Sequence, residues 1–347
     1  MGEYAHRLNF FAIVTKTVED GSSAVSGGKG DAMQRRFRAA SLVLLVGLGL
    51  SLISCGEVNK LAARKAYKDA IQLYKQQDYK RAAEKYKEAV DLDPNLTTAY
   101  FYLANSYDNQ FKATKRGDPT NDAYLTEAIK YYQIAADRDP DPKLRTWALQ
   151  YLVNAYGADK ANDPAQAELV LQKMIQTDPT DPANYFALAK LYEDAGQYEP
   201  AEQALLKAKE VKPDDPLVYG QLAGFYNRQG EFEKTIEAYK QQEQIEPNNP
   251  EVYYTIASFY WDKAYHDARL KDAEKRQMVA AGKEEVDKAL QINPNYIEAL
   301  VSKGLLLRVE AGLEKDRARY DELMKQAQAL TDKGTALSKR RAAGLAR

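Results

Sequence analysis

The sequence predicts an all-α fold built from repeated pairs of helices. Six similar segments each end in a proline, namely Pro94, Pro140, Pro179, Pro213, Pro247 and Pro294. Three of these prolines, Pro179, Pro213 and Pro247, lie 34 residues apart. Between them, apolar residues recur at the spacing of one face of an amphipathic helix. A period near 34 residues with this pattern is typical of antiparallel helix pairs that stack on one another.

The clearest copy runs from Pro182 to Pro213. Its first helix carries the apolar stripe Tyr185, Leu188, Ala189 and Tyr192, and its second carries Ala201, Leu205 and Ala208. A turn is predicted at Gly196, and the closing proline ends the second helix. The next copy repeats the same grid with Tyr219, Leu222, Ala223, Tyr226, Gly230, Phe232, Tyr239 and Pro247.

These stripes, turns and closing prolines resemble the tetratricopeptide-repeat family over residues 62–332. The resemblance implies a right-handed α-α superhelix, or solenoid, of about seven helix pairs. It also implies that the protein binds a partner protein or peptide in the concave groove of the solenoid. The same resemblance predicts no cofactor and no small-molecule substrate.

Two copies depart from the period. Between Tyr107 and Ala128 the second copy has an insert, and Gly117–Asp122 predicts a loop there. Trp261–Ala281, in the sixth copy, contains no Gly or Pro, so we expect both helices of that pair to be lengthened.

The seventh pair has no closing proline and is highly charged, as a capping repeat requires. Residues 333–347 form a basic tail with Lys339, Arg340 and Arg341. A frayed, solvated end is the simpler interpretation, and contact with anionic lipid is the alternative.

Residues 33–54 have the pattern of a signal peptide. Arg35, Arg36 and Arg38 precede an uncharged run over residues 39–54 that is short for a membrane span. The run ends in Leu52-Ile53-Ser54-Cys55, which resembles the bacterial lipoprotein lipobox. The resemblance implies that Cys55 is lipidated and becomes the mature N-terminus, with residues 55–61 as a tether. A buried thiol at the end of an uncleaved anchor is the alternative.

Residues 1–32 do not resemble a secretory start, because they precede Met33 and are rich in Gly and Ser. We expect translation to start at Met33, which would make the upstream stretch a gene-start artefact. A disordered cytoplasmic extension is the alternative.

The two resemblances together predict a lipid-anchored interaction scaffold of the bacterial cell envelope. Its partners would be other envelope proteins or peptides, and its membrane contact would run through Cys55. Gly56 is not the aspartate that retains lipoproteins at the inner membrane in enterobacteria, so the outer membrane, on its periplasmic side, is favoured. The runner-up is a cytosolic-side or inner-membrane adaptor with an uncleaved N-terminal anchor.

Composition argues against catalysis and nucleic-acid binding. The chain has 49 basic and 50 acidic residues, so it lacks the basic excess of a nucleic-acid-binding protein. It has one cysteine and two histidines, of which only His266 follows the signal. A zinc set, a Cys–His pair or a Ser–His–Asp triad cannot be built from these. We therefore predict no metal site and no enzyme activity.

In this family the first helix of each pair lines the groove at fixed positions. The residues at those positions here are Phe101, Asn105, Gln150, Asn154, Phe186, Lys190, Asn227, Arg228, Tyr254 and Trp261, with Tyr67 at the start. Asparagine amides can pair with an extended peptide backbone, and aromatic faces can take apolar side chains. The alternative for Phe101, Phe186 and Trp261 is packing against neighbouring helices. Only Lys190 and Arg228 approach a carboxylate clamp, so we do not expect binding of an acidic C-terminal peptide.

Overall fold

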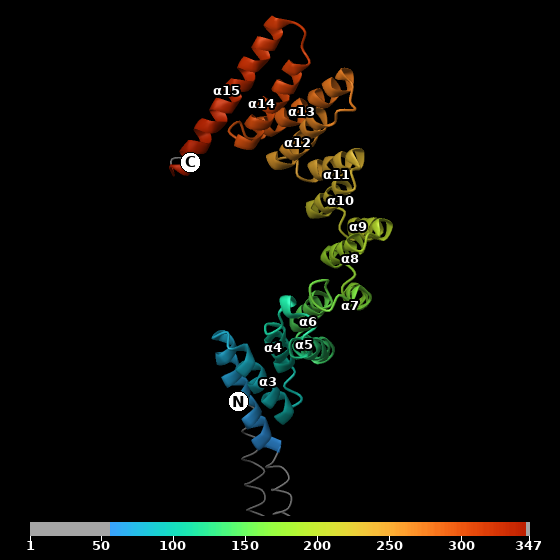
Figure 1. Ribbon diagram of the computed structural model, residues 1–347, viewed down its shortest axis with the longest axis vertical. Helices are drawn as coiled ribbons and strands as arrows, with labels where there is room; N and C mark the ends of the chain where they lie inside the picture. Colours follow the sequence, from blue (N-terminus) through green and yellow to red (C-terminus); the bar gives the residue numbers. More distant parts are fainter. Residues whose placement is uncertain (1–55, 345–347) are drawn as a thin grey trace, which may run out of the picture. The chain divides into compact units, whose positions relative to one another are not determined.

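The computed structural model describes residues 56–344, and in that range the chain is helical with no β-strand (Figure 1). The predicted all-α helical-repeat fold is confirmed. The chain divides into two compact units, one ending at Gln110 and the other beginning at Phe111. The boundary between the two units falls in the insert of the second repeat. The sequence had predicted a single solenoid over residues 62–332.

Over its described residues, 56–110, unit 1 contains three helices. They are a helix over residues 56–75, α3 (Tyr79–Leu92) and α4 (Thr98–Asp108). Tyrosine rings fill the space between them, with the ring of buried Tyr86 stacked 5.9 Å from that of Tyr102 and edge-on to that of Tyr67 at 5.7 Å. Burial raises the pKa of the Tyr86 hydroxyl. The tyrosines of this unit therefore serve packing.

Unit 2 contains the remaining helices, which pack chiefly on their neighbours in the chain. They are α5 (Pro119–Arg138), α6 (Pro142–Ala155), α7 (Pro164–Thr177), α8 (Pro182–Asp194), α9 (Tyr198–Val211), α10 (Pro216–Arg228), α11 (Phe232–Ile245), α12 (Pro250–His266), α13 (Asp272–Ile292), α14 (Ile297–Gly312) and α15 (Arg317–Ala342). Contacts between sequence neighbours are the signature of a repeat protein. The even-numbered helices are the first helices of their pairs.

The start of three first helices follows from a single dipeptide. In α6, α8 and α10 an aspartate caps the helix and a proline occupies the first turn, at Asp141-Pro142, Asp181-Pro182 and Asp215-Pro216. Each aspartate side chain accepts a hydrogen bond from a backbone N–H of the first turn, and proline has no N–H to leave unpaired. These prolines are a second set, distinct from the ones that close the repeats.

The turns inside the pairs use glycine where the backbone requires it. Gly196 has a φ of 71° between α8 and α9, and Gly230 has a φ of 74° between α10 and α11. This left-handed conformation strains any residue with a Cβ atom, which explains the glycine at these two turns.

The second-repeat insert differs from the predicted loop. Asp118 caps α5 and Pro119 begins it, so only Gly117 and Asp118 of the predicted segment Gly117–Asp122 lie outside the helix. The loop instead precedes the helix and holds a short 3-10 turn, η1 (Ala113–Lys115). The prediction was wrong because an Asp-Pro dipeptide suits a helix start as well as a loop.

The C-terminal pairs are longer than the regular ones. α12 has 17 residues and α13 has 21, against 13 and 14 in α8 and α9, as expected from the sequence without Gly or Pro. α15 has 26 residues and continues beyond residue 332. Lys339, Arg340 and Arg341 therefore lie in the last turn of a helix rather than in a separate tail. Cations are favoured at this end by the helix dipole.

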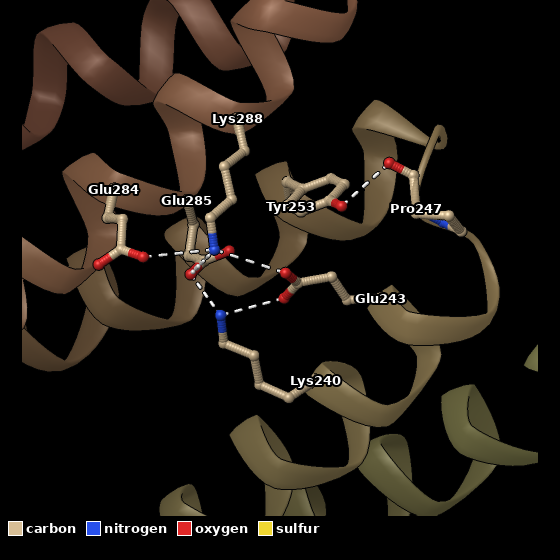
Figure 2. A network of polar contacts seen from close by, with 7 residues as sticks. All are labelled: Lys240, Glu243, Pro247, Tyr253, Glu284, Glu285 and Lys288. Atoms are coloured by element: carbon tan, nitrogen blue, oxygen red, sulfur yellow. Dashed lines mark hydrogen bonds and ion pairs between the residues drawn. The ribbon is translucent and has the colours of Figure 1, made fainter.

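Figure 2 shows an ion network that joins α11 to α13. Buried Glu285 contacts Lys240 and, at 3.1 Å, Lys288. Glu243 lies 3.0 Å from Lys240 and 3.4 Å from Lys288, so both lysines bridge Glu243 and Glu285. Lys288 also lies 3.4 Å from Glu284. Burial lowers the pKa of Lys240, but its hydrogen bonds to Glu285 and Glu243 outweigh that effect, and the pKa is raised. The fifth and sixth repeats are thus joined by charge as well as by apolar packing.

Candidate partner-binding surface

The first helices of unit 2 present most of the predicted groove residues. Those that are exposed are Gln150 and Asn154 on α6, Lys190 on α8, and Asn227 and Arg228 on α10. Those that are half-buried are Phe186 on α8, and Tyr254 and Trp261 on α12. We call these eight residues the first-helix surface. It combines amide, charged and aromatic side chains, as the sequence predicted.

Two predicted groove residues lie in unit 1 and are buried there. Phe101 is 5% exposed and Asn105 is 4% exposed. The Asn105 side-chain oxygen accepts hydrogen bonds from the Tyr74 hydroxyl at 2.5 Å and from Asn109 Nδ2 at 2.8 Å. For these two positions the groove prediction is corrected, because their side chains serve the interior of the fold. Tyr67 also packs inside unit 1, against Tyr86.

The two cations of the first-helix surface are engaged within the chain. Arg228 on α10 binds Glu193 on α8 through two hydrogen bonds, Nε to Oε1 at 2.7 Å and Nη2 to Oε2 at 2.9 Å. These bonds raise the pKa of Arg228 and tie successive repeats together. Lys190 lies 2.5 Å from Asp194 one turn along α8. Arg228 is therefore held by a two-bond ion pair, whereas the Lys190–Asp194 pair is a solvent-exposed one that contributes little.

The half-buried aromatics pack and also reach solvent. Phe186 lies against the apolar cluster built by α8, α9, α10 and α11. Tyr254 meets Tyr296 edge-on, with ring centroids 5.7 Å apart. Trp261 packs against the cluster of α12, α13 and α14, and its ring stacks on Tyr265. Each of these rings packs against neighbouring helices and is also partly exposed. Packing, the alternative considered for Phe186 and Trp261, therefore accounts for only part of each ring's surface.

A cavity that the sequence did not reveal lies beside Lys190. Its volume is about 360 Å³, and it is lined mainly by apolar atoms of Val153, Tyr156, Ala167, Ala187 and Leu191. The long connection between α6 and α7 forms one wall, where regular pairs have a tight turn. Asn162 in that connection has a φ of 54°. The signal in the sequence was the spacing of Pro140 and Pro179, which is 39 residues (179 − 140) instead of 34.

Two aromatic side chains on α6 were also missed. Trp147 is 47% exposed and Tyr151 is 39% exposed, on the helix that carries Gln150 and Asn154. Their positions, three or four residues from Gln150 and Asn154, place all four on one face of α6. An exposed tryptophan off the apolar stripe was the signal that could have indicated this surface.

The structure does not reach the predicted lipidation site. Cys55 and the segment 33–54 lie outside the described residues. Among the helices that are described, none combines the length and the apolar character needed to cross a bilayer. Within residues 56–344, no group of three or more His, Cys, Asp or Glu side chains is arranged to hold a metal ion. His266 is exposed at the end of α12.

Comparison with protein families matches both units. A family model described as tetratricopeptide repeat matches residues 160–223, and a second, described as TPR repeat, matches residues 72–110. Residues 72–110 and 160–223 are thus similar to tetratricopeptide repeats. No curated protein matches the sequence.

Solved structures similar to this repeat chain have low sequence identity to it. One is the C-terminal part of a TPR repeat-containing protein from Cytophaga hutchinsonii, with a TM-score of 0.52 and 18% identity over 78% of this chain and 98% of that one. A tetratricopeptide repeat protein from Parabacteroides merdae has a TM-score of 0.41 and 15% identity over 77% and 99%. MamA has a TM-score of 0.38 and 19% identity over 52% and 92%. The first likeness supports the fold alone.

Proposed function

We propose that the protein is a lipid-anchored scaffold of the bacterial cell envelope that binds a partner protein or peptide on the first-helix surface of unit 2. Repeat proteins of this family are generally scaffolds rather than enzymes. The observation that carries the proposal is the face of α6, where Gln150 and Asn154 lie beside exposed Trp147 and Tyr151. Amides can pair with a peptide backbone, and Trp and Tyr are the residues that dominate binding interfaces.

The cavity beside α8 supports the same interpretation. Its volume of about 360 Å³ is at the lower end of the range for ligand pockets, and its lining is mainly apolar. Lys190, a member of the first-helix surface, lies at this cavity. An apolar side chain of a bound segment would enter the cavity while its backbone meets the α6 amides.

The surface is tested by partner capture from envelope extracts. The double variant Gln150→Ala/Asn154→Ala removes two exposed amides without removing packing, so its helical circular dichroism should match that of the wild type. The matched control is Gln203→Ala/Gln244→Ala, which removes two exposed amides from the second helices α9 and α11. We expect partners to be lost from the first variant alone. Equal recovery of every partner by both variants would contradict the proposal.

The anchor rests on the sequence Leu52-Ile53-Ser54-Cys55. Two or three acyl chains at one cysteine give stable membrane attachment where a single chain would not. Cys55→Ser should keep the signal attached and abolish incorporation of labelled palmitate. A Cys55→Ser protein that still runs at the mature size and still takes up palmitate would contradict the lipid anchor. An unlipidated wild-type protein retaining residues 39–54 would favour the inner-membrane adaptor.

A further inference from the structure

The lengthened end of α12 carries a cluster of three aromatic rings. The rings of Trp261 and Tyr265 are stacked, with centroids 5.5 Å apart and planes inclined by 13°. His266 meets both edge-on, at 5.8 Å from Trp261 and 4.9 Å from Tyr265. Tyr265 is 61% exposed, so the stack ends in an aromatic surface that faces solvent.

The surroundings of this stack favour a positive charge. The exposed Asp262 carboxylate lies 2.9 Å from His266 Nδ1, and His266 is the one basic side chain within ion-pair distance of it among residues 56–344. A carboxylate can accept about four hydrogen bonds, so one such contact leaves most of its capacity. The C-terminal end of α12 adds the negative pole of the helix dipole.

The chain's own neighbouring cations are held elsewhere. Asp267 binds Lys263 at 2.9 Å and Arg269 at 2.8 Å, and these hydrogen bonds hold the pKa of Asp267 well below its usual range. Lys263 also lies over the ring of Phe232, 5.5 Å from its centroid. Neither cation therefore competes for the Asp262 carboxylate.

Six other aromatic rings in the described part of the chain lie under one of the chain's own cations. Such a lysine or arginine lies over Tyr131, Tyr219, Tyr226, Phe232, Tyr253 and Tyr320. In the described part of the chain, no lysine or arginine lies over Trp261 or Tyr265. The stack at the end of α12 thus combines an uncovered aromatic face with an adjacent carboxylate.

We propose that this cluster binds an arginine side chain of the partner. A planar guanidinium can stack on the Tyr265 ring while its N–H groups donate to Asp262, whereas a lysine ammonium lacks the planar face. This proposal rests on the proposed function, because the arginine would belong to the partner that the scaffold binds. It assigns the recognition to Tyr265 and Asp262, with Trp261 as the ring that supports Tyr265.

The test follows binding at the cluster itself. The chain has two tryptophans, so Trp147→Phe leaves Trp261 as the single source of an indole N–H signal in NMR spectra. The probe is the peptide acetyl-Gly-Arg-Gly-amide, compared with the same peptide containing citrulline or lysine. We expect a saturable shift of the Trp261 signal with the arginine peptide. Citrulline keeps the shape and loses the charge, so the citrulline peptide should bind several-fold more weakly.

Two variants assign the contacts. In the Trp147→Phe background, Tyr265→Ala and Asp262→Asn should each weaken binding of the arginine peptide by about two- to fivefold. The matched controls, Tyr198→Ala and Asp159→Asn, change an exposed tyrosine and an exposed aspartate elsewhere and should leave the affinity unchanged. Equal binding of the lysine or citrulline peptide, or equal affinity of all four variants, would overturn the proposal.

The two proposals can fail separately. If the arginine peptide does not bind while Gln150→Ala/Asn154→Ala still loses the envelope partners, only the arginine site is wrong. If the arginine peptide binds as expected while that double variant keeps every partner, the first-helix surface is wrong and the end of α12 is a separate site.

Discussion

The Tyr219 hydroxyl donates a hydrogen bond to the backbone carbonyl of Pro213, 2.7 Å away. The same bond recurs six residues apart in other repeats, from Tyr185 to Pro179 and from Tyr253 to Pro247, each at 3.0 Å. The proline lies in the turn that follows the second helix of one pair, and the tyrosine lies in the first helix of the next. The bond therefore pairs a backbone carbonyl of the connecting turn, and it fixes the junction between repeats.

Tyr219→Phe removes this hydroxyl and keeps the ring. Because Tyr219 is buried and the Pro213 carbonyl loses its donor, we expect the free energy of unfolding to fall by about 1 kcal/mol. The measurement is thermal or urea unfolding followed by circular dichroism. Tyr198→Phe is the control, since this tyrosine is exposed and should show almost no change. Equal stability of the two variants would mean that the junction bond contributes nothing.

A second prediction concerns the ion network of Figure 2. Glu285→Gln keeps the shape of a buried side chain and removes the charge that Lys240 and Lys288 share, so we expect a loss of about 1–3 kcal/mol in unfolding free energy. Glu284→Gln is the neighbouring control, because the Glu284 side chain is 70% exposed and lies 3.4 Å from Lys288. Surface pairs of that kind contribute about 0–1 kcal/mol. The hypothesis fails if urea unfolding gives the two variants the same midpoint.

The repeat pattern could be predicted from the sequence because the residues that recur at helical spacing are the ones that the fold buries. Tyr219, Leu222, Ala223 and Tyr226 were chosen by helical spacing, and all four are buried. The degree to which each residue of a stripe is buried was harder to predict. Leu188 occupies the same repeat position as Leu222, yet it is only half-buried. Depth depends on which neighbouring repeat covers a residue, and the spacing of one helix carries no information about its neighbour.

The surface was predictable only in part, for the same reason. Family positions located the exposed amides Gln150 and Asn154, but also Asn105, which the structure buries. The bond between Arg228 and Glu193 joins residues 35 positions apart on successive first helices, and nothing in either segment indicates it. The tyrosines were assigned to packing, and their hydroxyl bonds to proline carbonyls became evident only from the helix geometry.

A third prediction concerns alkaline pH. Burial raises the pKa of many tyrosines, and that of Tyr226 reaches about 12 through burial and its hydrogen bond to Glu202. A pKa above the ordinary value of 10 means that the folded state keeps a proton that the unfolded state loses. Stability from this source is therefore complete below pH 10 and is lost as the pH rises from 10 towards 12. Absorbance at the tyrosinate band should rise together with the loss of helical circular dichroism. Ionisation of all tyrosines with a midpoint at the ordinary pH of 10, while the helices stay intact, would contradict this coupling.

The last prediction compares two leucines at equivalent repeat positions. Leu222 is buried in the cluster of α8, α9, α10 and α11, whereas Leu188 is only partly buried against it. Leu222→Ala should cost about 2–5 kcal/mol, because the cavity it leaves is enclosed, and Leu188→Ala should cost less, because solvent already reaches that site. Neighbouring repeats depend on one another, so the loss at Leu222 should lower the thermal midpoint of unit 2 rather than loosen one helix pair. Differential scanning calorimetry gives both midpoints. A larger drop in the thermal midpoint for Leu188→Ala than for Leu222→Ala would contradict the prediction that Leu222 contributes more to stability.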